Sequence, residues 1–305
     1  MHFDHRNIFQ LQLTRRLARS LAVACFAAAF AGSCGGETSA QGRQSRRVLV
    51  LLSSSDRLEL RDGESYQTGF FLNELTVPVD RLIKAGYEPV LATPDGRPAV
   101  MDGVSDHARY FRDAREYERL KNLMRKLLPA TRSFDGILAA GLDDYAGVFV
   151  PGGHAPMQDL AVDARVGKIL RAFHANARPT ALICHGPAAL LSAAADPGAF
   201  VQALAAGDRE GARRAAGDWP YAGYRMTAFS ESEEDVVENS GRLAAALRWD
   251  LEAALRILGA RVEVNQANFK SRVVRDRELI TGQNPASDEH FTEVLLEALA
   301  AAKKN

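Results

Sequence analysis

The chain has 305 residues, of which 47% are hydrophobic and 25% are charged, so it carries enough apolar side chains to form a buried core. Its 38 basic and 38 acidic side chains balance, which argues against nucleic acid as the main partner, because phosphate binding requires a basic excess. Three cysteines in this length exclude a disulfide-rich scaffold, and no cysteine–histidine spacing typical of structural zinc is present. We therefore expect a globular protein with no metal site.

The first 40 residues have the composition of an export signal. A basic start precedes an apolar run of small residues at 21–31, which is too short for a comfortable membrane span. Residues 31–34 read Ala-Gly-Ser-Cys and look like a bacterial lipobox, in which Cys34 would become the lipidated first residue. Two alternatives remain open, which are ordinary cleavage near Ala40 and an internal apolar helix.

This pattern predicts the domain organisation. We expect a signal peptide of the lipoprotein type at 1–33, a flexible tether at 34–46 and a single α/β domain at 47–305. The mature protein would be exported, either as a periplasmic protein or as a lipoprotein that touches the membrane only through the lipid on Cys34. Cys184 would then be its only free thiol.

From residue 47 onward, short apolar strands alternate with helical segments. Strands are predicted at 47–52, 88–93, 145–150, 179–183, 224–229, 262–264, 272–274 and 278–281. Helices are predicted at 68–85, within 106–128, and at 161–177, 186–194, 231–238, 243–258 and 287–302, with a helical insertion near 200–223. This alternation favours a doubly wound, mostly parallel sheet flanked by helices, whose sites lie at the carboxyl ends of the strands.

Cys184 stands at such a strand end. It directly follows the strand at 179–183, and Gly186 and Pro187 suit the start of a helix two residues later. A cysteine at so tight a strand-to-helix turn resembles a nucleophile elbow. The positive end of the helix dipole would favour the thiolate, so we predict a reactive thiol rather than a buried structural one.

Two further features point to the same edge of the sheet. Gly152 and Gly153 follow the strand at 145–150, and their amides could hold an oxyanion formed when Cys184 attacks a carbonyl. Glu74 lies in an apolar stretch of the helix at 68–85, where an unpartnered carboxyl is costly. If Glu74 meets Cys184, burial would favour its protonated form and let it donate to the sulfur; the alternative is a solvated glutamate.

Five segments resemble the PfpI-like superfamily, which is related to type 1 glutamine amidotransferases. They are Gly-Phe-Phe-Leu-Asn-Glu-Leu at 69–75, Ala-Gly-Tyr-Glu at 85–88, Pro-Gly-Gly-His at 151–154, Cys-His-Gly-Pro-Ala-Ala-Leu at 184–190 and Leu-Ile-Thr-Gly-Gln-Asn-Pro-Ala-Ser at 279–287. Their order and spacing are most similar to the heat-shock chaperone and glutathione-independent glyoxalase branch. The resemblance implies a flavodoxin-like sheet and a homodimer.

The resemblance also implies roles for individual residues. The family nucleophile falls on Cys184, its histidine on His185 and the glutamate that contacts the sulfur on Glu74. The third acid, which would orient the imidazole, falls on Glu234, with Glu233 as the neighbouring alternative. The backbone of His185 would complete the oxyanion site with the two glycines.

These residues lead to a functional hypothesis with two alternatives. We expect a cysteine-dependent, cofactor-independent enzyme of the lyase class that converts the small dicarbonyls methylglyoxal and glyoxal to 2-hydroxy acids. The alternatives are a stress-related holdase chaperone or redox sensor, and a hydrolase (an amidase, peptidase or deglycase) that uses the same cysteine. The insertion near 200–223 could cover the mouth of the site and alter its substrate.

Overall fold

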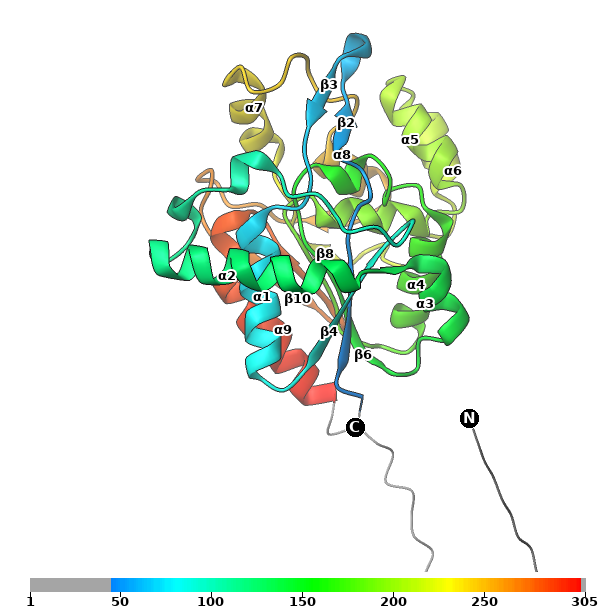
Figure 1. Cartoon of the computed structure of the whole chain (residues 1–305). Coiled ribbons are helices and arrows are strands. Elements are labelled where there is room, and N and C mark those ends of the chain that lie inside the picture. Colours follow the sequence, from blue (N-terminus) through cyan, green and yellow to red (C-terminus); the bar gives the residue numbers. More distant parts are fainter. Residues whose placement is uncertain (1–44, 303–305) are drawn as a thin grey trace, which may run out of the picture. The chain divides into compact units, whose positions relative to one another are not determined.

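The computed structural model describes residues 45–302 (Figure 1). The predicted signal peptide at 1–33 and the predicted lipidation site at Cys34 lie outside the described residues, so both remain predictions. Within residues 45–302, no helix is both long enough and apolar enough to cross a membrane.

A seven-stranded sheet forms the core of the fold. Its order is β10-β11-β7-β6-β1-β4-β5. The strands are β1 (Arg47–Leu51), β4 (Glu88–Thr93), β5 (Arg132–Ser133), β6 (Tyr145–Val150), β7 (Thr180–Ile183), β10 (Val273–Asp276) and β11 (Leu279–Gly282). Every neighbouring pair is parallel except β10 with β11, which is antiparallel. The predicted mostly parallel, flavodoxin-like sheet is therefore confirmed.

Helices cover both faces of this sheet. They are α1 (Leu72–Lys84), α2 (Ala114–Leu127), α3 (Phe134–Ala140), α4 (Ala164–Ala175), α5 (Pro197–Ala205), α6 (Arg209–Ala216), α7 (Glu231–Asn239), α8 (Leu251–Ile257) and α9 (Asp288–Ala302). Figure 1 shows α1, α2 and α9 on one side of the sheet and α3 and α4 on the other. Because both faces are covered, β1, β6 and β7 are almost continuously apolar.

The structure differs from the sequence-based predictions mainly in short elements, whose formation depends on hydrogen bonds and contacts with residues distant in sequence. Residues 53–67, where no strand was predicted, contain an antiparallel hairpin of β2 (Arg57–Glu59) and β3 (Ser65–Gln67). The short strand β5 and helix α3 were not predicted. The helix expected at 186–194 is a 3₁₀ helix, Gly186–Ala193.

Two predicted elements are much shorter than expected. The strand at 224–229 is reduced to β8 (Arg225–Met226), which pairs in parallel with β9 (Arg261–Val262) outside the main sheet. It ends there because the next amide, that of Thr227, donates to the side chain of Thr281 instead of to a backbone carbonyl. The helix expected at 243–258 is limited to α8, whose first turn is capped by Asp250.

The strand order places the predicted site. Strands β6 and β7 are neighbours in the sheet, so the segments that follow their carboxyl ends, 151–154 and 184–185, lie against each other. The first turn of α1 reaches the same place, because Phe71 donates its amide proton to the carbonyl oxygen of Gly152 at 3.0 Å.

Candidate active site

Cys184 occupies a strained turn between β7 and the 3₁₀ helix Gly186–Ala193. Its φ angle is +60°, in the left-handed region that a side chain rarely adopts. The turn is fixed on both sides, because the amide of Cys184 donates to Gly282 and its carbonyl accepts from Phe229. A Cβ at Gly186 would lie 2.5 Å from the carbonyl oxygen of Val150, so glycine is required there. This is the geometry of a nucleophile elbow.

His185 connects the thiol to Glu234. The sulfur of Cys184 lies 3.3 Å from Nδ1 of His185, and Nε2 of His185 lies 2.8 Å from Oε2 of Glu234. The ring of His185 stacks on Phe229, with centroids 4.6 Å apart. The structure thus brings Cys184, His185 and Glu234 into one chain of contacts, and it places Glu234 rather than Glu233 against the imidazole.

The electrostatics of this chain leave His185 neutral at neutral pH. Burial and the neighbouring His154 lower the pKa of His185 to about 4. Burial alone would raise the pKa of Glu234, but the two imidazoles hold it well below its usual range. The carboxylate of Glu234 can only accept a hydrogen bond, so Nε2 of His185 must donate and carries the ring proton. Nδ1 is then unprotonated, and its lone pair faces the thiol of Cys184.

Glu74 lies beside the thiol of Cys184, in the first turn of α1, and it is fully buried. Neither carboxyl oxygen has a partner with ordinary hydrogen-bond geometry, and the polar groups beside it are the thiol of Cys184 and the amide of Gly152. Burial raises its pKa well above the usual range, which favours the protonated, neutral carboxyl. A neutral carboxyl beside a sulfur can donate a hydrogen bond to it.

The resting charge of Cys184 differs from the prediction. Burial is the largest cause that raises the pKa of the thiol well above its usual value, which argues against the resting thiolate that the sequence predicted. The short 3₁₀ helix that follows does not offset the loss of hydration around a buried sulfur. Cys184 therefore needs a base to become a nucleophile, and Nδ1 of His185 is in position to act as one.

The two glycines after β6 have different positions in the site. A Cβ at Gly152 would lie 2.5 Å from Cβ of Cys184 and closer still to Oε2 of Glu74, so only glycine lets these side chains meet. The amide of Gly152 lies beside the carboxyl group of Glu74, so the oxyanion role expected of Gly152 stays a prediction. Gly153 has a φ of +89°, and its amide faces the sulfur. The amides of Gly153 and His185 remain as candidates for the oxyanion site.

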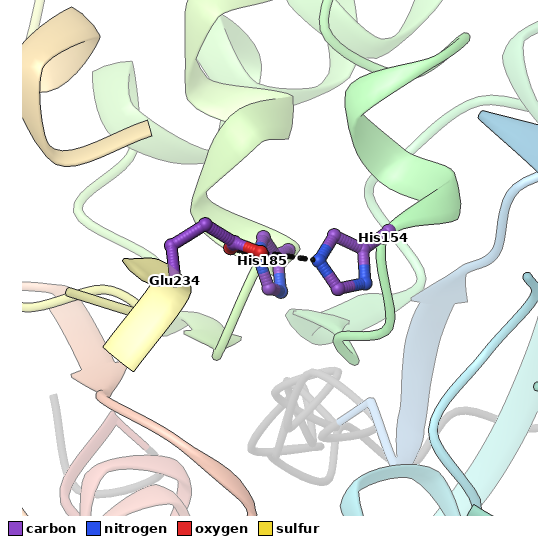
Figure 2. Close-up of side chains that lie close together, drawn as sticks. All are labelled: His154, His185 and Glu234. Atoms are coloured by element: carbon purple, nitrogen blue, oxygen red, sulfur yellow. Dashed lines mark hydrogen bonds and ion pairs between the residues drawn. The ribbon is translucent and has the colours of Figure 1, made fainter. Parts of the chain in front are cut away.

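Sequence reasoning missed His154. Its Nε2 lies 3.0 Å from Oε1 of Glu234, and its ring lies over that of His185 with centroids 4.0 Å apart (Figure 2). Burial alone would lower the pKa of His154, but Glu234 more than offsets this and raises it. Its position directly after the glycine pair, at the carboxyl end of β6, was the signal that could have identified it.

These three side chains also bring together the atom types that bind metal ions. One ligand atom from each of His154, His185 and Glu234 lies within 4.8 Å of the others, and all three residues are buried. No motif in the sequence indicated this group, because its donors come from three separate segments.

A cavity of about 640 Å³ opens onto the thiol and both imidazoles. Its lining consists largely of aromatic and charged side chains, including Tyr66, Phe71, Asp102, Arg109, Tyr110, Phe229, Arg242, Phe269 and Asp288. The insertion near 200–223 is not part of this lining, so the expectation that it covers the mouth of the site is wrong. Its aromatic residues are buried elsewhere, where Trp219 donates to Leu190 and Tyr221 to Leu170.

Comparison with known proteins points to one family. A model of the DJ-1/PfpI family matches residues 66–200. The chain is 28% identical over 266 residues to the protein/nucleic acid deglycase HchA of Pseudomonas aeruginosa, and the aligned region covers 84% of this chain and 82% of that protein. It is 27% identical over 260 residues to the HchA deglycase of Staphylococcus aureus, at 85% and 82% coverage.

A solved structure shows the same fold. The crystal structure of glyoxalase III from Candida albicans superposes with a TM-score of 0.63 at 22% identity, covering 83% of this chain and 96% of that one. The family match includes Cys184, His185, Glu74 and the glycine pair. Residues 66–200 therefore match the DJ-1/PfpI family, and the similarity to HchA deglycases over most of the chain supports the resemblance to the PfpI-like superfamily that its motifs indicated.

Proposed function

We propose that this protein is a cysteine-dependent enzyme that detoxifies reactive carbonyl compounds and converts methylglyoxal or glyoxal to a 2-hydroxy acid without an added cofactor. The observation that carries the proposal is the thiol of Cys184, 3.3 Å from the unprotonated nitrogen of His185, on the wall of a cavity of about 640 Å³. The relatives named protein/nucleic acid deglycases support an enzyme of carbonyl chemistry.

In the first step, Nδ1 of His185 takes the thiol proton while the sulfur attacks the aldehyde carbon. The electron pair of the carbonyl moves to its oxygen, which lies where the amides of Gly153 and His185 can donate to it. The carboxylate of Glu234, 2.8 Å from Nε2, stabilises the imidazolium that forms. His185 then returns its proton to the oxygen, which completes a hemithioacetal.

In the second step, His185 removes the hydrogen on the carbon bonded to sulfur, which gives an enediol. Protonation of the neighbouring carbon, with loss of the proton from the hydroxyl on the sulfur-bearing carbon, then yields a thioester of the 2-hydroxy acid. Water attacks this thioester, the carbon–sulfur bond breaks, and Cys184 recovers its proton. The sum is one dicarbonyl and one water converted to one 2-hydroxy acid, so no external oxidant or reductant is needed.

Glu74 assists by staying protonated. A carboxylate there would repel a forming thiolate, whereas the neutral carboxyl donates a hydrogen bond to it. Gly152 makes this possible because it lets the two side chains approach.

The test is conversion of methylglyoxal to lactate by purified protein in the absence of glutathione. We expect Cys184→Ala to lower turnover by about 1000-fold or more, because the nucleophile is lost. His107→Ala is the matched control, since His107 is exposed and lies outside the site. Thermal unfolding of each variant establishes that it is folded. Full turnover by folded Cys184→Ala would overturn the proposal.

The size of the cavity favours a second candidate, a deglycase. A volume of about 640 Å³ is in the range of pockets that take drug-sized ligands and exceeds the need of a three-carbon dicarbonyl. The same nucleophile could act on a methylglyoxal adduct of an amine or thiol and release the 2-hydroxy acid. A higher kcat/KM for preformed adducts than for free methylglyoxal would favour this candidate over the first.

A further inference from the structure

We propose that His154, His185 and Glu234 form a binding site for a transition-metal dication such as Zn²⁺, and that an ion bound there inhibits the enzyme reversibly. The inhibition rests on the proposed function, whereas the binding site does not. The site would thus be regulatory, since the dicarbonyl reaction needs no metal.

The donor set and its spacing carry the site. Two imidazoles and one carboxylate are the protein ligands of several catalytic zinc sites. Oε1 of Glu234 is 3.0 Å from His154 Nε2, Oε2 is 2.8 Å from His185 Nε2, and one donor from each residue lies within 4.8 Å of the others (Figure 2). Ligands bound to zinc at ~2.1 Å in a tetrahedron are ~3.4 Å apart, so donors that lie within 4.8 Å of one another would have to move closer together on binding, by as much as ~1 Å.

The surroundings hold these ligands in place. The ring of His185 lies between those of His154 and Phe229, with centroids 4.0 and 4.6 Å away. Glu234 is in the first turn of α7, where Ser230 and Glu233 form a capping box that fixes the backbone. Rigid, buried ligands lose little freedom when they bind an ion.

The charge of the site also favours a cation. In the part of the chain that the structure describes, the ion pairs of Glu234 are with the two imidazoles and include no lysine or arginine. The buried Glu233 is the next residue. A metal ion would therefore take the place of the protons that the imidazoles donate to Glu234, without breaking a pair with another fixed cation.

An ion can reach the site through the cavity. His154 and His185 both line it, so an ion bound between them would keep an open position for water. Cys184 also lines the cavity, but its sulfur lies beside Nδ1, on the other side of the ring from Nε2. The thiol is therefore not expected to be a ligand.

Inhibition follows because the metal and the thiol proton of Cys184 would bind to different nitrogens of the same His185 ring. When a metal occupies Nε2 of a neutral imidazole, the ring proton must sit on Nδ1. Nδ1 is the atom that has to accept the thiol proton of Cys184, so the base is blocked while the nucleophile stays in place. Removal of the ion restores the proton to Nε2 and the activity.

The test measures metal binding directly, by titration calorimetry with Zn²⁺ and by absorption of the Co²⁺ form, on metal-free protein. We expect Cys184→Ala to bind as tightly as the unchanged protein and the Co²⁺ spectrum to lack a sulfur-to-metal charge-transfer band. His154→Phe, which retains a ring over His185, and Glu234→Gln should each weaken binding by about 10- to 100-fold or more. His290→Ala is the control, because His290 is exposed.

The outcomes separate this inference from the proposed function. Loss of binding in Cys184→Ala, or unchanged binding in folded His154→Phe, would overturn the site. Zn²⁺ should abolish dicarbonyl turnover and a chelator should restore it; tight binding with full turnover would overturn the inhibition. Metal binding by a protein that lacks all dicarbonyl activity would overturn the proposed function and leave the site standing.

Discussion

The carboxylates of Glu233 and Glu234 are adjacent in sequence but serve different clusters. Glu234 faces His154 and His185 in the active site. Glu233 is the N3 residue of the capping box of α7, and it accepts hydrogen bonds from the backbone of Ser230 and Phe269 and from the side chains of Gln283 and Asn284. Neighbouring side chains on a helix point about 100° apart, so the two carboxylates face different surroundings. The same helical turn therefore holds Glu233 in the capping cluster and Glu234 in the active site.

Glu233→Ala is expected to be strongly destabilising. The substitution leaves several buried donors without an acceptor, and each unsatisfied group costs about 1–3 kcal/mol. We expect the free energy of unfolding to fall by about 3 kcal/mol or more, as measured by urea denaturation. Asp235→Ala is the control, since Asp235 lies exposed on the same helix. A loss below about 1 kcal/mol would show that the donors find other partners.

Gly152→Ala is expected to separate Glu74 from Cys184. The added Cβ would lie 2.5 Å from Cys184 Cβ and 2.9 Å from the carbonyl oxygen of Ile183, so the chain must move. We expect a loss of stability of about 1–3 kcal/mol from overpacking and a drop in turnover of at least about 100-fold. Gly103→Ala is the matched control, because its Cβ meets nothing within 4 Å. Equal behaviour of the two variants would contradict the close contact.

The buried carboxyl of Glu74 should make stability depend on pH. Its pKa is raised in the folded state, so the folded protein binds more protons than the unfolded chain above about pH 4.5, and stability falls as the pH rises from there. Glu74→Gln cannot ionise, so its stability relative to the unchanged protein should increase from pH 5 to pH 9 in urea denaturation. The exposed Glu293→Gln serves as control. Parallel profiles for Glu74→Gln and the unchanged protein would refute a protonated Glu74.

Asp250 provides a second pH-dependent effect away from the thiol. Burial raises its pKa to about 6, although it caps α8 by accepting the amide of Ala253 at 2.6 Å. Stability should therefore fall as the pH rises from about 4 to about 6. Asn caps helices as well as Asp, so Asp250→Asn should be more stable than the unchanged protein at pH 8 by an amount on the order of 1–3 kcal/mol.

Thermal or urea unfolding measures this difference. Asp208→Asn is the control. Asp208 caps the N-terminus of α6 but is exposed, so its replacement keeps a capping side chain and removes no buried charge. A destabilised Asp250→Asn at pH 8 would mean that the charge of Asp250 contributes more than its burial costs.

The parts of this protein that could be predicted from sequence are those set by local chemistry. Apolar runs predicted β1, β4 and β6 almost to the residue, because a strand buried on both faces must be apolar throughout. The Cys-His-Gly-Pro turn after β7 indicated the elbow, since only a tight turn with a close backbone approach requires Gly186. Ser230 and Glu233 mark the start of α7 in the same local way.

The features that depend on contacts between distant segments became visible only in the tertiary structure. It brought His154 to Glu234 across 80 positions of sequence, turned the amide of Gly152 toward Glu74, and left the insertion near 200–223 outside the cavity. It also decided the protonation of Cys184, because the hydration that a thiolate loses depends on every group packed around the sulfur. The local sequence pattern determines which strands, helices and turns form. The reactivity of the site depends on burial and on contacts between side chains that are distant in sequence, and both arise only when the chain packs.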